Sequence, residues 1–234
     1  TRQLFVNRGL LPIDELFRPS QKSIGRTNHL TLSGHKCMRG FSGGLYPGSS
    51  YYDIDSVVYY PYSPESTMTL LAELGFEDTD GNGIVNWTDG ALAGDDLVIS
   101  LNSGTAAPAS GQVAEAMVLL LADVGIQVNH RPLQGPAADD AELTGTWEMR
   151  VQRISSAWTV PFTKCVELGP VTNITPEWHR EGGEGRELLD FEVEMVDVIN
   201  EFCLEPDSEA RKELMFRYNQ LFTENVYNVG GVLG

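Results

Sequence analysis

The sequence predicts an α/β fold in which helices flank a sheet that contains parallel strands. Residues 97–103 alternate in polarity and are rich in Val, Ile and Leu, which is typical of a half-buried strand. Apolar side chains then recur at helical spacing over residues 113–124, and Gly125 stands where a left-handed residue would end the helix. Residues 126–130 return to a strand pattern. Such a β-α-β unit places two parallel strands in one sheet.

Four elements are expected before this unit. Residues 11–17 are compatible with a short helix, and residues 25–48 are rich in Gly, Ser and basic side chains, as a surface loop would be. A helix is predicted to begin at Ser63, because a capping serine precedes a proline and an acid at the first helical positions. Gly75 ends this helix, and a loop follows at residues 78–90.

The elements expected after the unit are a turn-rich loop at 132–140, a third strand at 147–154, a long loop at 155–185, a helix at 187–203, a second helix capped by Asp207, and a strand at 226–230. Long loops in compact domains are often functional. We therefore expect residues 155–185 to contribute to a binding site.

The net charge of −17, from 16 basic and 33 acidic residues, opposes binding to nucleic acid or to an anionic membrane. Thr1 is not an initiator methionine, so we expect a mature product or an excised segment.

The three cysteines are odd in number, which leaves at least one thiol unpaired. Cys165 and Cys203 could pair only if the long loop folds back on the helix, and we expect them instead to be buried free thiols. A reducing compartment and a periplasm with few disulfides fit equally well.

The predicted elements of the chain follow one another in an order that resembles that of a known protein family. They are the Ser63 helix ending at 71–76, an Asp/Asn/Gly loop, a strand, a helix ending at 124–126, a strand ending in Arg153, and a last helix from Asp207 that runs into 223–227. Over about residues 46–230 this ordered set resembles the carboxy-terminal lobe of the family 5 extracellular solute-binding proteins, which are the oligopeptide, dipeptide and nickel receptors of ABC importers.

The resemblance implies a periplasmic, monomeric receptor of two lobes that closes on its ligand and presents it to a membrane permease. Residues 1–234 would form a single α/β lobe of the type II binding-protein fold, and the amino-terminal lobe would be missing. Residues 1–45 match less clearly. The resemblance implies ligand capture rather than an enzymatic reaction, and we predict a peptide-like solute.

The resemblance also indicates where the ligand would bind. In the family, the segment after the third strand often reads Trp-x-x-Asp-Tyr-x-Asp-Pro, and its first Asp can hold the amino terminus of a peptide. Here residues 154–161 keep the proline and an aromatic but lack both acids, while Arg153 offers a cation for an anionic group. Ligands of open α/β sheets bind beyond the carboxyl ends of the strands. The predicted half-site consists of Arg153, Trp158, Phe162 and His179, and the alternative is loop packing with Trp158 in the core.

Residues 78–89 follow the pattern of a calcium-binding loop, with oxygen-bearing side chains at alternate positions and a glycine at the sixth. The predicted ligands are Asp78, Asp80, Asn82, Ile84 through its backbone carbonyl, Asn86 and Asp89. No helix follows, so we expect an isolated structural calcium loop and no required cofactor. The alternative is an Asx-rich turn that needs glycine at positive φ.

Two other functional classes stay open. A serine hydrolase would use Ser42, in a Gly-x-Ser-x-Gly pattern, with His35 or His179. No strand is predicted before Ser42, and Pro47 opposes a helix after it.

His29, His35 and Cys37 suggest a metal site, but no fourth ligand is evident. The third class is a calcium-stabilised interaction module. The sequence does not identify the ligand.

Overall fold

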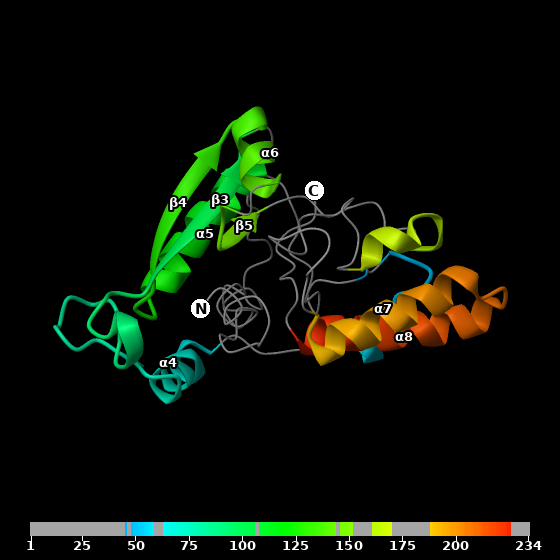
Figure 1. Cartoon of the computed structure of the whole chain (residues 1–234), viewed down its shortest axis with the longest axis horizontal. Helices are drawn as coiled ribbons and strands as arrows, with labels where there is room; N and C mark the ends of the chain where they lie inside the picture. Colours follow the sequence, from blue (N-terminus) through cyan, green and yellow to red (C-terminus); the bar gives the residue numbers. More distant parts are fainter. Residues whose placement is uncertain are drawn as a thin grey trace, which may run out of the picture.

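The computed structural model describes residues 45, 48–58, 63–105, 108–143, 146–151, 161–169 and 188–225. Figure 1 shows a sheet with its helices on one side of the molecule and a pair of long helices, α7 and α8, on the other. Each part has its own hydrophobic cluster. Among the described residues, no helix is both long enough and apolar enough to cross a membrane.

The predicted β-α-β unit is confirmed. It consists of β3 (Val98–Gly104), α5 (Pro108–Ala122) and β4 (Gln127–Leu133), and β5 (Met149–Val151) joins the other edge of β3. The strand order is β4-β3-β5, and both pairings are parallel. β5 is the described part of the strand predicted at 147–154.

One face of this sheet packs against α5. Ile99 and Leu101 of β3 are buried in a cluster with Ala114, Met117 and Leu121 of the helix. Gly125 has φ +80°, and a Cβ there would lie 3.0 Å from a side-chain carbon of Val85. The turn therefore requires glycine both for its left-handed backbone and for this close approach.

The helix predicted from Ser63 is α4 (Pro64–Glu73), and the Ser63 hydroxyl accepts a hydrogen bond from the Ser66 amide at 3.1 Å. A hairpin of β1 (Phe76–Glu77) and β2 (Asn86–Trp87) follows, and its two aromatic rings meet edge to face at 4.5 Å. A short 3-10 helix, η2 (Gly90–Leu92), then leads to β3. The two strands enclose the loop at 78–85, and the Val85 backbone donates to the Gly125 carbonyl and accepts from the Leu97 amide, both at 2.8 Å.

The prediction of a loop at residues 132–140 is wrong. β4 continues to Leu133, and α6 (Gly135–Leu143) begins directly afterwards. The Pro132 ring is tolerated because β4 lies at the edge of the sheet formed by the described residues, where no ladder among them needs its missing amide hydrogen. Pro136 then stands in the first turn of α6, and the alanines after it favour helix.

The two closing helices are α7 (Asp190–Leu204) and α8 (Ser208–Glu224). Between them lies a cluster whose large members are Met195, Ile199, Phe202, Met215, Tyr218 and Phe222. Buried polar groups attach other segments to this pair. The Tyr218 hydroxyl donates to the Leu168 carbonyl at 2.9 Å, and the Asn219 amide bonds Leu45 at 3.1 Å and Ser56 at 2.8 Å. Ser56 lies in the short helix η1 (Ile54–Ser56).

The long loop predicted at 155–185 contains two short 3-10 helices, η4 (Pro161–Thr163) and η5 (Cys165–Leu168). Cys165 and Cys203 form a disulfide, with Cα atoms 5.8 Å apart, so the prediction of two free thiols is wrong. Because η5 packs back against α7, the two cysteines meet although they lie 38 residues apart in sequence. The predicted helix at 11–17, the strand at 226–230 and Cys37 lie outside the described residues.

The disulfide is expected to stabilise the α7–α8 part of the fold. Closing a loop of 38 residues restricts the unfolded chain, so reduction should lower the free energy of unfolding by about 2–4 kcal/mol. Urea unfolding with and without dithiothreitol measures this change. The control is the double variant Cys165→Ser/Cys203→Ser, in which dithiothreitol should have no effect. Equal stability of the oxidised and reduced protein would contradict the expectation.

Candidate functional site

Of the predicted ligand half-site, the structure describes only Phe162. Its side chain is 45% exposed, and its ring lies edge-on to Phe202 of α7, with ring centres 5.9 Å apart. The Arg211 guanidinium of α8 stacks over the same ring at 4.3 Å. Phe162 therefore packs on the α7–α8 pair. Arg153, Trp158 and His179 lie outside the described residues, as do Ser42, His29, His35 and Cys37.

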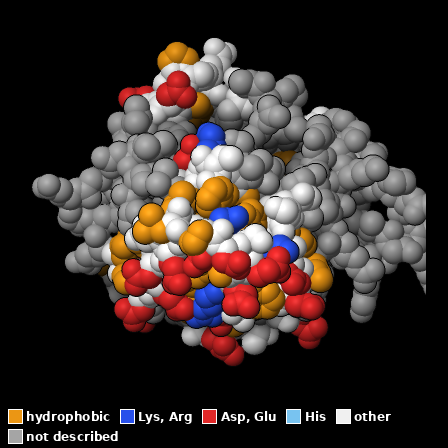
Figure 2. Space-filling view, turned by 90° about the vertical axis from the view of Figure 1, so that its right-hand side faces the viewer, with side chains coloured by type: hydrophobic (Ala, Val, Ile, Leu, Met, Phe, Trp, Pro, Cys, Tyr) orange, Lys and Arg blue, Asp and Glu red, His pale blue; other side chains and the backbone are white. Residues whose placement is uncertain are grey.

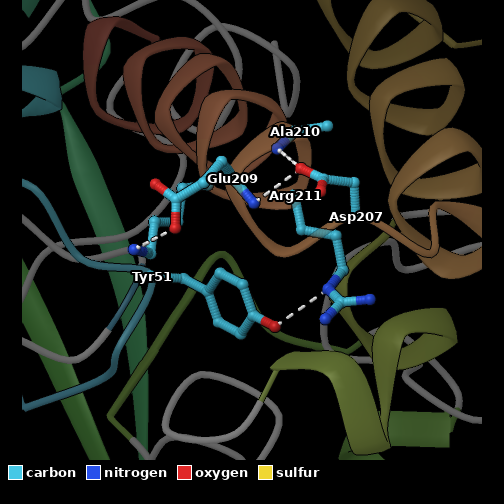
Figure 3. A network of polar contacts seen from close by, with 6 residues as sticks. Tyr51, Asp207, Glu209, Ala210 and Arg211 are labelled. Atoms are coloured by element: carbon cyan, nitrogen blue, oxygen red, sulfur yellow. Dashed lines mark hydrogen bonds and ion pairs between the residues drawn. The ribbon is translucent and has the colours of Figure 1, made fainter.

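Arg211 connects three segments on the α7–α8 side of the molecule, and Figure 3 shows its contact with Tyr51. Its Nε donates to the Tyr51 hydroxyl at 3.1 Å, and its Nη1 donates to the carbonyls of Glu205 at 2.8 Å and Pro206 at 3.2 Å. Together with the stacking on Phe162, these contacts join the turn between the helices to the segments at 48–58 and 161–169. Arg211 thus has a structural role in the described part of the chain.

Beside this network lies an open hollow lined by Ser50, Tyr51, Tyr52, Asp53, Lys212, Glu213 and Phe216. Burial, and then the nearby Asp53 carboxylate, raise the pKa of Tyr52 above its usual value. Asp207 caps α8, and hydrogen bonds from the backbone amides of Ala210 and Glu209 lower the pKa of its carboxyl. Figure 2 shows acidic side chains gathered on this side of the molecule with few basic ones, which opposes an anionic partner there.

A second polar region lies on the sheet. Asn102 of β3 pairs in register with Arg131 of β4 and with Arg150 of β5. Residues paired across a sheet point to the same face, so these three side chains form one row, which we call the Arg-Asn-Arg row. It lies on the face opposite Leu101 and the α5 core. Asn102 is two residues before the carboxyl end of β3, the end at which open α/β sheets bind ligands.

Neighbouring residues support this row. Glu148 accepts two hydrogen bonds from Ser100, one from its backbone amide at 2.7 Å and one from its hydroxyl at 2.8 Å, which fixes the approach to β5. The guanidinium of Arg150 lies 5.2 Å from the centre of the Trp147 ring. The sequence does not predict the row, since its only signal there is polar alternation in three separate strands, whose pairing register is not visible in the sequence.

The predicted calcium loop is closed by its own hydrogen bonds. The Asp78 carboxylate accepts from the amides of Gly81 at 2.7 Å and Gly83 at 2.9 Å, and Asp80 accepts from the amide of Asn82 at 3.1 Å. Gly81 and Gly83 both have positive φ, as the alternative of an Asx-rich turn requires. Asp89 lies apart from these contacts, at the start of η2.

Two further residues define the chemistry of this loop. The buried Asn86 accepts hydrogen bonds from Thr79 and donates to Asp96 at 2.7 Å, so both ends of its side-chain amide are bonded within the protein. The Asn82 amide donates to both Asp80 at 3.1 Å and Asp96 at 3.2 Å. Asp96 was not among the predicted ligands. Within the described ranges, no group of three or more His, Cys, Asp or Glu side chains is arranged to hold a metal ion. The loop therefore keeps its shape through amide donors, and calcium binding stays a prediction.

Comparison with known proteins places this geometry in context. No protein-family model matches the sequence. The periplasmic alpha-galactoside-binding protein of Rhizobium meliloti (strain 1021) is 34% identical over 192 residues, which are 81% of this chain and 28% of that protein. The periplasmic binding protein MelB of Agrobacterium fabrum C58, solved in complex with stachyose, matches with a TM-score of 0.82 and 28% identity, over 96% of this chain and 33% of that one.

More distant structures share the fold. The oligopeptide-binding protein OppA matches with a TM-score of 0.76 and 19% identity, over 99% of this chain and 38% of that one. NikA from Brucella suis, in complex with Fe(III)-EDTA, matches with a TM-score of 0.69 and 15% identity, over 96% of this chain and 42% of that one. These matches establish the fold of one lobe of a periplasmic binding protein. The chain spans less than half the length of each of these proteins.

If the loop at 78–89 binds calcium, about 1 mM calcium chloride should raise the melting temperature of the protein, because a cation bound only by the folded state stabilises it. Asp78→Asn should reduce that calcium-dependent rise. Asp95→Asn, at an exposed acid outside the loop, is the matched control and should leave the rise unchanged. An equal melting temperature in calcium and in EDTA would contradict calcium binding and support the alternative of a hydrogen-bonded, Asx-rich turn.

Proposed function

This chain belongs to the family 5 periplasmic solute-binding proteins, and from that premise we propose that it forms one lobe of a receptor that captures a small solute for import by an ABC transporter. The observation that carries the proposal is the agreement of sequence and fold over most of the chain with two periplasmic binding proteins. Because the chain spans less than half of these relatives, the remaining lobe would supply the other half of the ligand site.

We further propose that the solute is an oligosaccharide. The relative at 34% identity is named for alpha-galactosides, and the structure at 28% identity holds stachyose. The peptide-binding structure OppA is more distant, at 19% identity, so it bears on the fold alone. Residues 154–161 also lack both acids that would hold a peptide amino terminus. These observations favour a sugar over the peptide-like solute predicted from the sequence, which becomes the alternative.

The predicted half-site is retained in part in this proposal. Arg153 offers hydrogen-bond donors, and Trp158 offers an aromatic face against which the apolar side of a sugar ring can stack. Phe162 contributes to packing on α8 instead, as its contact with Arg211 indicates. His179 is retained as a candidate polar contact. Asn102 and the arginines beside it are added from the sheet.

A receptor is favoured over a hydrolase, since the relatives are named as binding proteins. The periplasm is an oxidising compartment, and the Cys165–Cys203 disulfide is suited to it. A membrane permease is the proposed partner, and a monomer is the proposed state. The acidic surface in Figure 2 does not favour nucleic acid as a ligand.

Thermal unfolding of the full-length receptor tests the proposal. Stachyose at 100 times its dissociation constant should stabilise the folded state by about 2.7 kcal/mol and raise the melting temperature, because it binds only that state. A pentapeptide and Fe(III)-EDTA serve as comparison ligands and should produce no shift. A shift with the pentapeptide alone would replace the sugar by a peptide. No shift with any solute, together with a shift with calcium, would favour an interaction module.

A further inference from the structure

Two buried polar atoms in the described part of the chain have no hydrogen-bond partner: the amide oxygen of Asn102 and the indole nitrogen of Trp147. Each residue is only 6% exposed. The other end of the Asn102 amide donates to the Thr146 carbonyl at 3.4 Å. Flipping that amide would place two oxygens against each other, so the Thr146 contact favours the orientation in which Asn102 presents an unpaired acceptor.

The two residues belong to one neighbourhood. Asn102 contacts Thr146, which precedes Trp147 in the chain. Asn102 is also paired in register with Arg150, whose guanidinium lies 5.2 Å from the centre of the Trp147 ring. This neighbourhood surrounds the middle of the Arg-Asn-Arg row, and Thr146 and Trp147 reach it from just before the amino end of β5.

The unpaired atoms are chemically complementary. Asn102 offers an acceptor and Trp147 offers a donor, and leaving either of them buried without a partner destabilises the folded state. A hydroxyl group can donate to the first and accept from the second. An ammonium group can satisfy only Asn102, and a carboxylate can satisfy only Trp147. A single neutral hydroxyl therefore fits the pair better than either charged terminus of a peptide.

We propose that Asn102 and Trp147 together bind one hydroxyl group of a carbohydrate ligand and so help to set the specificity of the receptor for sugars. This inference rests on the proposed capture of an oligosaccharide and assigns residues to it. The arginines of the same row, Arg131 and Arg150, flank the position in the sheet. A buried water has the same hydrogen-bonding capacity as a hydroxyl and is the competing occupant.

Calorimetric titration of the full-length receptor with stachyose distinguishes the two occupants. Trp147→Phe removes the indole donor but keeps an aromatic ring beside Arg150, and Asn102→Ala removes the acceptor. Each change should weaken stachyose binding about tenfold. The double variant should lose less than the product of the two single losses, because both residues serve one hydroxyl. Trp87→Phe is the matched control, since that ring packs on Phe76 in the β1–β2 hairpin, and it should keep the original affinity.

The outcomes separate this inference from the proposed function. If the unmodified receptor binds stachyose and both single variants bind it equally well, the pair holds only a buried water and the inference is wrong, while the receptor function stands. If the unmodified receptor binds a pentapeptide and not stachyose, the proposed sugar and the inference both fail. Should Asn102→Ala not fold, Trp147→Phe alone decides, because it keeps the ring and most of the side-chain volume.

Discussion

The parallel pairing of β3 with β4 and β5 is the constraint on which the sheet and the proposed site depend. Its register sends Ile99 and Leu101 into the core beneath α5 and sends Asn102 to the opposite face, between two arginines. A shift of one residue would exchange the two faces, burying the polar row and exposing the apolar one. The hydrophobic core therefore holds the polar row in place, and the α5 crossover between β3 and β4 holds the core.

The α7–α8 pair is stabilised by different means. Its apolar cluster is joined to distant segments through buried polar groups, with Tyr218 and Asn219 bonding residues 50 and more positions away. The disulfide and Arg211 add two further connections to the segment at 161–169. Specific hydrogen bonds, a covalent bond and a stacked guanidinium thus hold segments with little regular secondary structure of their own against the two helices.

Local patterns predicted the fold well, because they depend on neighbours in sequence. The β-α-β unit, the Ser63 and Asp207 caps and the glycine at 125 follow from periodicity, from capping chemistry and from a left-handed turn. The ordered set of these patterns also led to the correct family. The disulfide was missed because it needs η5 to pack on α7, a contact between distant parts of the chain. The α6 helix was missed although its signals are local, since Pro136 and the alanines after it were interpreted as a turn. The Asn102–Trp147 pair needs the sheet register, which spacing along the chain does not contain.

The central claim is that the polar face of the sheet around Asn102 binds a sugar. The most direct measurement is the structure of the full-length receptor in complex with stachyose. We expect one sugar hydroxyl within hydrogen-bonding distance, about 3 Å, of both the Asn102 amide oxygen and the Trp147 indole nitrogen. A stachyose molecule bound elsewhere, with an ordered water between those two atoms, would contradict it.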